Sequence, residues 1–210
     1  FEFNDLYHEH VSYGTLNDSK GNPFKTREGG TKPLSELFDE TYNYIKNINN
    51  TLSDSTITHL TNSVLTYSDL ITNRKTDYKF DLEKFTNVNG KTGIYIQYSQ
   101  VRAKKLIETI ENHKEEIKEL ILNKTDKQLL SKLFLFSHYL EQSALLNEPH
   151  HLANYLYEIS NLFNQFYENE KLSSITDPNH IASKLFITNL FLTTSHNTMF
   201  CLGILPVNEM

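Results

Sequence analysis

The sequence has little of what cross-links, tight turns and cysteine-rich metal sites require. Its 210 residues include one cysteine, five prolines, seven glycines and no tryptophan. So few glycines and prolines disfavour a β fold with many turns and favour long regular elements. Because 38% of the residues are hydrophobic and 12% are aromatic, the chain can form a packed core. We therefore predict a mainly α-helical protein.

The single cysteine, Cys201, excludes an internal disulfide and a zinc site built from cysteines. Its apolar neighbours Met199, Phe200 and Leu202 predict that the thiol is buried as a small hydrophobic group. A lone reduced thiol fits a reducing compartment, and we expect a cytoplasmic protein.

Basic charge is also scarce, because the formal net charge is −6. Nucleic-acid-binding modules usually carry a basic excess, since neutralising phosphates supplies much of their affinity. The charge therefore disfavours a DNA-binding protein, and any nucleic-acid contact would have to be local and depend on shape. The best basic run, between Arg102 and Lys132, is interleaved with acidic residues, which favours a solvated helix face.

An apolar stretch between residues 185 and 205 raises the question of a membrane span. Its middle carries too many polar groups for contact with lipid: Asn189, Thr193, Thr194, Ser195, His196 and Asn197. We interpret the stretch as a buried core helix and expect no contact with membranes.

Apolar residues recur at helical spacing along most of the chain after Pro33. The pattern predicts helices at about 34–48, 57–71, 94–111, 114–123, 127–147, 149–168 and 178–204. Asp177 followed by Pro178 is a typical helix start. Because the connections are short, we expect neighbouring helices to pack antiparallel in a bundle.

The first 33 residues differ, since they hold four of the seven glycines and a run of turn formers from Asn17 to Pro23. The residues Val11–Tyr13 are predicted to end a strand. A segment of this kind cannot bury itself, so we expect the chain to be a fragment.

Within this segment, residues 21–31 read Gly-Asn-Pro-Phe-Lys-Thr-Arg-Glu-Gly-Gly-Thr. Two cations one residue apart, Lys25 and Arg27, precede the paired glycines Gly29 and Gly30. Such a loop can place charge and backbone N–H groups on a polyphosphate. The alternative is a solvated basic turn, which is common among short charged loops. The spacing is not that of a Walker loop.

This loop, preceded by Tyr13-Gly14 and followed by Leu34-Ser35-Glu36-Leu37, resembles the signature loop of arginyl-tRNA synthetases. In that family the loop corresponds to the class I "KMSKS" sequence and closes over ATP. The resemblance implies that Lys25, Thr26 and Arg27 act in catalysis, with the cations stabilising charge on pyrophosphate. It also implies that His10, Gly29 and Gly30 bind the nucleotide.

A second stretch, Tyr67–Asp81 with Gly90–Arg102, is similar to the start of the family's anticodon-binding domain. Tyr95, Gln97, Tyr98 and Arg102 would then contact tRNA, the tyrosines by offering faces to unstacked bases. The alternative for each tyrosine is an ordinary place in the core. In this stretch Ile94 and Gln100 stand where the family usually has proline and histidine.

A third match lies at the end of the chain, where Leu152–Tyr167 and Leu202–Met210 resemble the family's last helices and terminus. In the family the final residue lies near the anticodon, which implies a tRNA contact for Met210. The resemblance thus covers nearly the whole chain. It implies a helical bundle preceded by a short remnant of an α/β nucleotide-binding domain.

The implied activity is ATP-dependent attachment of arginine to its tRNA, with ATP, Mg²⁺, arginine and tRNA bound by a monomeric enzyme. We expect residues 1–33 to end the catalytic domain, 34–85 to form connecting helices, and 86–210 to form the anticodon-binding domain. The other ATP signature of the family, the "HIGH"-type motif, is missing. We therefore expect this chain to be inactive alone.

Two alternatives stay open. The first is the anticodon-binding module of another synthetase, such as the cysteinyl enzyme or the β chain of the glycyl enzyme. The loop at residues 25–30 disfavours this alternative. The second is a helical protein-interaction domain, which the acidic charge favours. No metal site is expected. His8-Glu9-His10 lacks a visible third ligand nearby, and His150-His151 suits a solvated turn at a helix start.

Overall fold

The computed structural model describes residues 8–17, 33–79, 81–110, 119–169 and 175–210. The longer helices are α1 (Leu34–Ile48), α2 (Asp54–Leu70), α4 (Gly93–Ile110), α5 (Lys124–Leu133), α6 (Phe136–Leu146), α7 (His150–Asn169) and α8 (Pro178–Cys201). A single turn, α3 (Leu82–Phe85), and two short strands, β1 (Leu16–Asn17) and β2 (Tyr78–Lys79), complete the described elements. The prediction of a mainly α-helical fold is confirmed.

Local sequence explains where these helices begin and end. Ser53 accepts a hydrogen bond from the Thr56 backbone N–H at the start of α2. At the start of α5, the side chains of Asn123 and Asp126 each accept from the other residue's backbone N–H, which forms a capping box. Helix α8 ends at Cys201, and two residues later Gly203 adopts a positive φ of 72°, which favours glycine.

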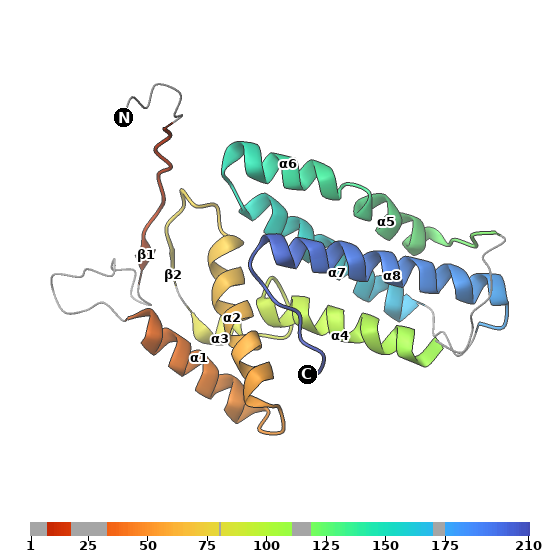
Figure 1. Cartoon of the computed structure of the whole chain (residues 1–210), viewed down its shortest axis with the longest axis horizontal. Helices are drawn as coiled ribbons and strands as arrows, with labels where there is room; N and C mark the ends of the chain where they lie inside the picture. The colour runs from red at the N-terminus through yellow and green to blue at the C-terminus, as the bar shows by residue number, and fades with distance from the viewer. Residues whose placement is uncertain (1–7, 18–32, 80, 111–118, 170–174) are drawn as a thin grey trace, which may run out of the picture.

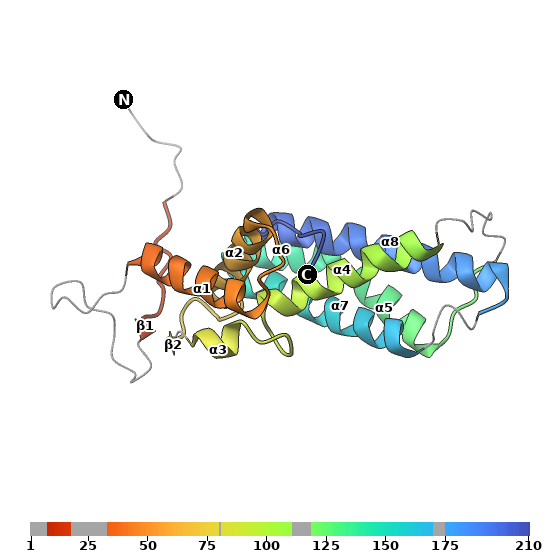
Figure 2. The ribbon, with the colours of Figure 1, turned by 90° about the horizontal axis from the view of Figure 1, so that it is seen from below.

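Helices α4, α5, α6, α7 and α8 form the predicted antiparallel bundle. Figure 1 shows α4 and α7 running one way along the long axis, and α5, α6 and α8 running the other way. Helices α1 and α2 form a hairpin across one end of the bundle, where α2 packs on α4. Figure 2 shows the same end from below, with the short strands beside α3.

Two groups of buried side chains hold these elements together. The larger lies inside the bundle and includes Tyr155, Phe163 and Phe191, with the two phenylalanine rings stacked 4.2 Å apart. The smaller joins α1 and α2 to α4 and contains Val207 from the C-terminal segment. The chain end is therefore part of the core that connects the hairpin to the bundle.

Several predicted bounds are wrong in detail. The single helix expected at 127–147 is two helices, because the Leu135 N–H bonds three residues back to Lys132 and the chain turns there. Residues 119–123 are not helical, since Asn123 caps α5 and the Ile121 N–H bonds to Ser183 instead. The remaining part of the helix expected at 114–123 lies outside the described residues.

Two further expectations are corrected near the chain ends. Residues 11–13 form no strand, and β1 lies at Leu16–Asn17, where it pairs in parallel with β2. The Cys201 thiol is exposed. Cys201 occupies the last helical position of α8, and the buried positions on either side belong to Met199 and Leu202. Among the described residues, no helix combines the length and the apolar character that crossing a bilayer needs.

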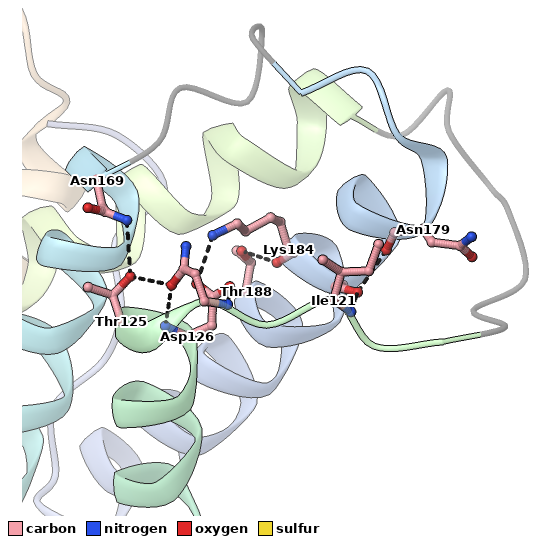
Figure 3. A network of polar contacts seen from close by, with 9 residues as sticks. Ile121, Thr125, Asp126, Asn169, Asn179, Lys184 and Thr188 are labelled. Carbon is pink, nitrogen blue, oxygen red and sulfur yellow. Dashed lines mark hydrogen bonds and ion pairs between the residues drawn. The ribbon is translucent and has the colours of Figure 1, made fainter.

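A buried ion pair connects α5 to α8 at the end of the bundle farthest from the α1–α2 hairpin. Lys184 Nζ donates to Asp126 Oδ1 at 2.7 Å, and both side chains are almost fully buried. The second Asp126 oxygen accepts from the Asn123 N–H at 3.0 Å. Figure 3 shows this group together with the Ile121 contact nearby. Because every oxygen of Asp126 has a donor, the capping box and the ion pair depend on each other.

We expect Lys184→Ala to lower the free energy of unfolding by about 3–5 kcal/mol, since it leaves the buried Asp126 carboxylate without its cation. Urea unfolding followed by circular dichroism measures this loss. The matched control is Lys46→Ala, which removes the exposed Lys46–Asp54 pair and should cost much less. Equal losses in the two variants would contradict this account of the buried pair.

Candidate functional site

Helix α4 carries most of the residues predicted to contact a ligand, and its start is fixed by a close approach to α2. Thr92 caps the helix by accepting from the Tyr95 N–H at 3.1 Å. At Gly93, a Cβ atom would lie 2.3 Å from the backbone oxygen of Ser63. Only glycine allows this separation, so the Gly90–Gly93 turn places α4 firmly against α2.

One face of α4 lies against α7 and forms a line of polar and aromatic contacts. The Lys91 ammonium donates to the side-chain oxygen of Asn154 at 2.8 Å. Next along the helix, the Tyr95 ring lies 5.5 Å from the Tyr157 ring, and its hydroxyl donates to Asn161 at 3.3 Å. Burial raises the pKa of Tyr95, so this hydroxyl remains a donor at neutral pH.

Arg102 lies about two turns further along the same face, where two aromatic rings contact it. Its guanidinium carbon lies 4.4 Å from the centre of the Tyr98 ring and 4.9 Å from that of Tyr167. The guanidinium also donates to Asn164 at 3.2 Å and to Glu168 at 3.1 Å. These contacts hold a planar cation in a fixed orientation between α4 and α7.

A groove of about 440 Å³ runs along these contacts. Tyr98 is 37% exposed, so part of its ring is open to solvent, whereas Tyr95 and Arg102 are half-buried. The groove offers ring faces together with amide groups, and its lining residues are Val88, Asn89, Tyr95, Tyr98, Arg102, Asn161, Asn164, Gln165 and Glu168. Flat aromatic ligands that also form hydrogen bonds suit such a groove.

Another face of α4 holds the C-terminal segment through Gln97, which is fully buried. The Gln97 amide nitrogen donates to Ser63 Oγ and to the Leu205 carbonyl, both at 2.7 Å. Its amide oxygen accepts from the Val207 N–H at 2.9 Å. Every polar atom of this side chain is therefore used inside the protein, between α2, α4 and the segment after α8.

The last residues continue along α4 as far as Lys104. The Lys104 ammonium donates to the Val207 carbonyl at 2.9 Å and to the Asn208 side chain at 2.8 Å. Burial lowers the pKa of Lys104. Met210 is half-buried and packs on the smaller core. The predicted ligand residues thus divide between the groove, with Tyr95, Tyr98 and Arg102, and the tail side of α4, with Gln97 and Met210.

The residues predicted to act in catalysis or to bind the nucleotide all belong to the first 33 residues of the chain. Lys25, Thr26, Arg27, Gly29 and Gly30 are all outside the described residues. His10 is described and is exposed. It belongs to the segment 8–17, which lies next to the loop between α2 and β2 through the Gly14 N–H bond to the Arg74 carbonyl at 2.5 Å.

Comparison with known protein families shows which family the helical bundle belongs to. Residues 96–210 match the family model described as the DALR anticodon binding domain, which covers more than half of the chain. The chain belongs to the DALR anticodon-binding domain family. Residues 2–82 match the model for the catalytic domain of class I (R) tRNA synthetases. The resemblance seen in the motifs is confirmed.

Curated proteins of similar sequence include arginine–tRNA ligases. The chain is 36% identical over 178 residues to the arginine–tRNA ligase of Francisella tularensis subsp. novicida, covering 80% of this chain and 31% of that ligase. It is 31% identical over 212 residues to the arginine–tRNA ligase of Pseudomonas fluorescens, covering 96% of this chain and 37% of that ligase. The chain thus spans about a third of the length of these relatives.

Solved structures share the fold. The arginyl-tRNA synthetase of Thermus thermophilus matches with a TM-score of 0.80 at 17% identity, covering 96% of this chain and 35% of that one. The arginyl-tRNA synthetase of Plasmodium falciparum matches with a TM-score of 0.66 at 24% identity, covering 84% of this chain and 32% of that one. At these identities the likeness shows the fold alone.

Sequence reasoning missed the part of the DALR-domain groove that α7 supplies. Asn154, Tyr157, Asn161, Asn164 and Glu168 recur every three or four residues and therefore share one helix face. That polar stripe was the available signal. The same helix also carries a strong apolar stripe, and this stripe by itself predicts an ordinary core helix.

The turn between α6 and α7 groups three side chains that often bind metals. Ligand atoms of Glu148, His150 and His151 all lie within 4.8 Å of one another. However, one Glu148 oxygen accepts from Lys75 at 3.1 Å and the other contacts the His151 ring at 3.1 Å. Both oxygens of the only carboxylate in the group are thus engaged by protein groups. His150 and His151, which were expected to form a solvated turn, are instead half-buried, and the His151 ring contacts Glu148.

Gln97→Leu should lower the free energy of unfolding of the DALR domain by about 2 kcal/mol or more. The reason is that the Leu205 carbonyl and the Val207 N–H both lose their partner. Urea unfolding measures the loss, and faster exchange of the Val207 amide locates it. Gln128→Leu, at an exposed position on α5, is the control and should change little. Unchanged Val207 exchange in Gln97→Leu would rule out this role for the amide.

Acidification should weaken the turn between α6 and α7. Burial lowers the pKa of His150 below 6.5, and His151 lowers it further. The unfolded chain therefore binds a proton at His150 more readily than the folded one, and stability falls as the pH drops below about 6.5. Unfolding free energies at about pH 7.5 and 5.5 should differ less in His150→Asn than in the wild type. His138→Asn, on exposed α6 surface, should keep the wild-type difference; a reversed pattern would refute the assignment.

Proposed function

We propose that this chain is part of an arginine–tRNA ligase and that the groove between α4 and α7 contacts the anticodon loop of arginine tRNA. The observation that carries the proposal is the stack of Tyr98, Arg102 and Tyr167 within a DALR domain. Single-stranded loops are commonly bound by aromatic rings and arginine planes, on which unpaired bases stack.

The contacts around the stack support base recognition over general attraction to phosphate. Asn161 and Gln165 present amide groups in the groove that holds the exposed ring of Tyr98, where they can pair with the edges of bases. Asn164 is buried, and its amide is bonded to Ser99 and Arg102. The Arg102 charge is partly offset by Glu168, 3.1 Å away. With a net charge of −6, the chain has little long-range attraction for RNA. Binding in this groove should therefore depend weakly on salt.

The residues on the tail side of α4 take a different part. Gln97 supports the C-terminal segment from inside, because no polar atom of its side chain is left for tRNA. This support fixes the position of Met210, for which a tRNA contact remains our proposal. We thus propose Tyr95, Tyr98, Arg102 and Met210 as the tRNA-contacting residues and assign Gln97 to positioning.

The match of residues 2–82 to the class I (R) catalytic-domain model supports ATP use, with residues 1–33 as the end of the catalytic domain. In that proposal Lys25, Thr26 and Arg27 stabilise the pyrophosphate charge, while His10, Gly29 and Gly30 hold the nucleotide with Mg²⁺. Residues 34–85 connect this part to the anticodon-binding domain at 86–210.

The substrates are ATP, arginine and tRNA, and the enzyme acts as a cytoplasmic monomer. The chain alone does not aminoacylate.

Fluorescence anisotropy with arginine tRNA and a second tRNA species tests the groove. Tyr98→Ala should weaken binding of arginine tRNA by roughly 5- to 150-fold, because stacking on an aromatic ring is worth about 1–3 kcal/mol per base. Arg102→Ala should act in the same direction.

Phe134→Ala is the matched control, since this ring is 75% exposed but lies at the α5–α6 junction, away from α4. It should bind like the wild type. Equal affinity of the wild type for both tRNAs, or equal losses in Tyr98→Ala and Phe134→Ala, would contradict the proposal. The first of these results would favour a helical protein-interaction domain.

A further inference from the structure

The two family regions of the chain meet where α6 turns into α7. On one side are the segment 8–17 and the loop 73–77, which fall within the class I catalytic match. On the other side is the turn at Asn147 and Glu148, which falls within the DALR match. Figure 1 shows the loop between α2 and β2 beside this turn. Contacts here therefore connect two regions that the family comparison separates.

Arg74 is at the centre of these contacts and is half-buried. Its Nε donates to the backbone carbonyl of Asn147 at 2.8 Å, and its Nη1 donates to the backbone carbonyl of Ser12. The Arg74 carbonyl in turn accepts from the Gly14 N–H at 2.5 Å. We call these four residues, Ser12, Gly14, Arg74 and Asn147, the corner contact.

The residue types at the corner contact follow from its geometry. Asn147 ends α6 in the left-handed conformation, with φ of 52°, so its carbonyl lies beyond the last helical turn and lacks an intrahelical donor. A planar guanidinium carries N–H donors on separate nitrogens at fixed angles, so Nε and Nη1 can each serve one of two carbonyls that lie apart. At Gly14, a Cβ would lie 2.6 Å from the backbone of Thr76, so only glycine fits.

Neighbouring bonds hold the same two segments together. The Thr15 N–H donates to the Asp77 carboxylate at 2.6 Å, and the Tyr78 N–H donates to the Thr15 carbonyl at 3.2 Å. Across the corner, the Asn147 side chain donates to Glu9 at 3.1 Å. Of all these residues, Arg74 alone contacts both the segment 8–17 and the turn after α6 through backbone carbonyls.

We propose that Arg74 is a positioning residue of the ligase. It holds the segment 8–17 against the turn between α6 and α7 and so fixes the position of Asn17, after which the chain continues to the proposed ATP loop. The anticodon groove lies on the same helix, at Asn161–Glu168, roughly 20 Å from His150 along its axis. Helix α7 thus contributes to the groove toward one end, and the corner contact lies at the turn that precedes its other end. The inference rests on the function proposed for the groove.

Amide hydrogen exchange in the 210-residue chain, read by NMR, tests the corner contact directly. In Arg74→Ala, exchange of the Gly14 and Thr15 amides should rise roughly tenfold or more, as expected for losing hydrogen bonds of about 1 kcal/mol each. Amides in the middle of α4 and α7 should keep their wild-type rates, and the affinity for arginine tRNA should stay within about twofold of the wild type. Arg74→Lys should restore part of the protection, because the single nitrogen of an ammonium cannot occupy the positions of both Nε and Nη1.

Lys75→Ala is the matched control. It removes a neighbouring cation and its ion pair with the half-buried Glu148 but leaves the Ser12 and Asn147 carbonyls and their donors in place, so Gly14 and Thr15 should exchange as in the wild type. If Arg74→Ala fails to fold, Gly14→Ala tests the same contact from the other side and should raise Thr15 exchange.

The proposal is overturned if Arg74→Ala leaves Gly14 and Thr15 protected. It is also overturned if exchange rises throughout α4 and α7 or tRNA affinity falls more than tenfold, since Arg74 would then support the whole bundle. Failure of the wild type to bind tRNA would contradict the function proposed for the groove. The amide exchange rates would still decide whether Arg74 positions the segment 8–17. In the intact ligase, the same variant should lower kcat for aminoacylation and leave KM for tRNA unchanged.

Discussion

The arrangement of this protein depends on one buried side-chain amide, that of Gln97 on α4. Its nitrogen donates to Ser63 on α2 and to the Leu205 carbonyl, and its oxygen accepts from the Val207 N–H. A buried amide that lacks hydrogen-bond partners is costly. Loss of any one of these bonds therefore destabilises the others and the packing around them. They hold the hairpin, the bundle and the chain end in one register. The smaller core, which contains Val207, packs around this point.

From this fixed position, α4 presents different faces to different partners. Its tail side is closed by the last residues of the chain, whereas the face toward α7 remains open as the groove with Tyr98 and Arg102. Helix α7 completes the groove with Asn161, Asn164 and Glu168, and the turn that leads into its other end carries Asn147 of the corner contact. A single continuous helix, α7, therefore runs from the corner contact to the groove.

Much of this could be predicted from the sequence, because local rules decide it. Apolar spacing placed α1, α2, α4, α7 and α8 to within a few residues, and the Asp177-Pro178 start of α8 is a local capping signal. Three ordered motifs identified the family, and Tyr98 and Arg102 lie together as part of one face of α4. Each of these depends on residues close together in the chain.

What failed depends on residues far apart. Nothing local shows that Asp126 pairs with Lys184, that Gln97 faces inward, or that α7 supplies amides to the groove, because tertiary packing selects these partners. The break at Phe134–Leu135 follows no glycine or proline, and the surrounding apolar residues fit one long helix equally well. Cys201 has apolar neighbours, but its direction at the end of α8 decides its exposure.

Nuclease footprinting of arginine tRNA bound to the chain tests the central claim most directly, namely that the α4–α7 groove contacts the anticodon loop. The account predicts protection of anticodon-loop nucleotides by the wild type, with that protection lost in Tyr98→Ala and kept in Phe134→Ala. Protection confined to other parts of the tRNA, or anticodon-loop protection that survives in Tyr98→Ala, would contradict it.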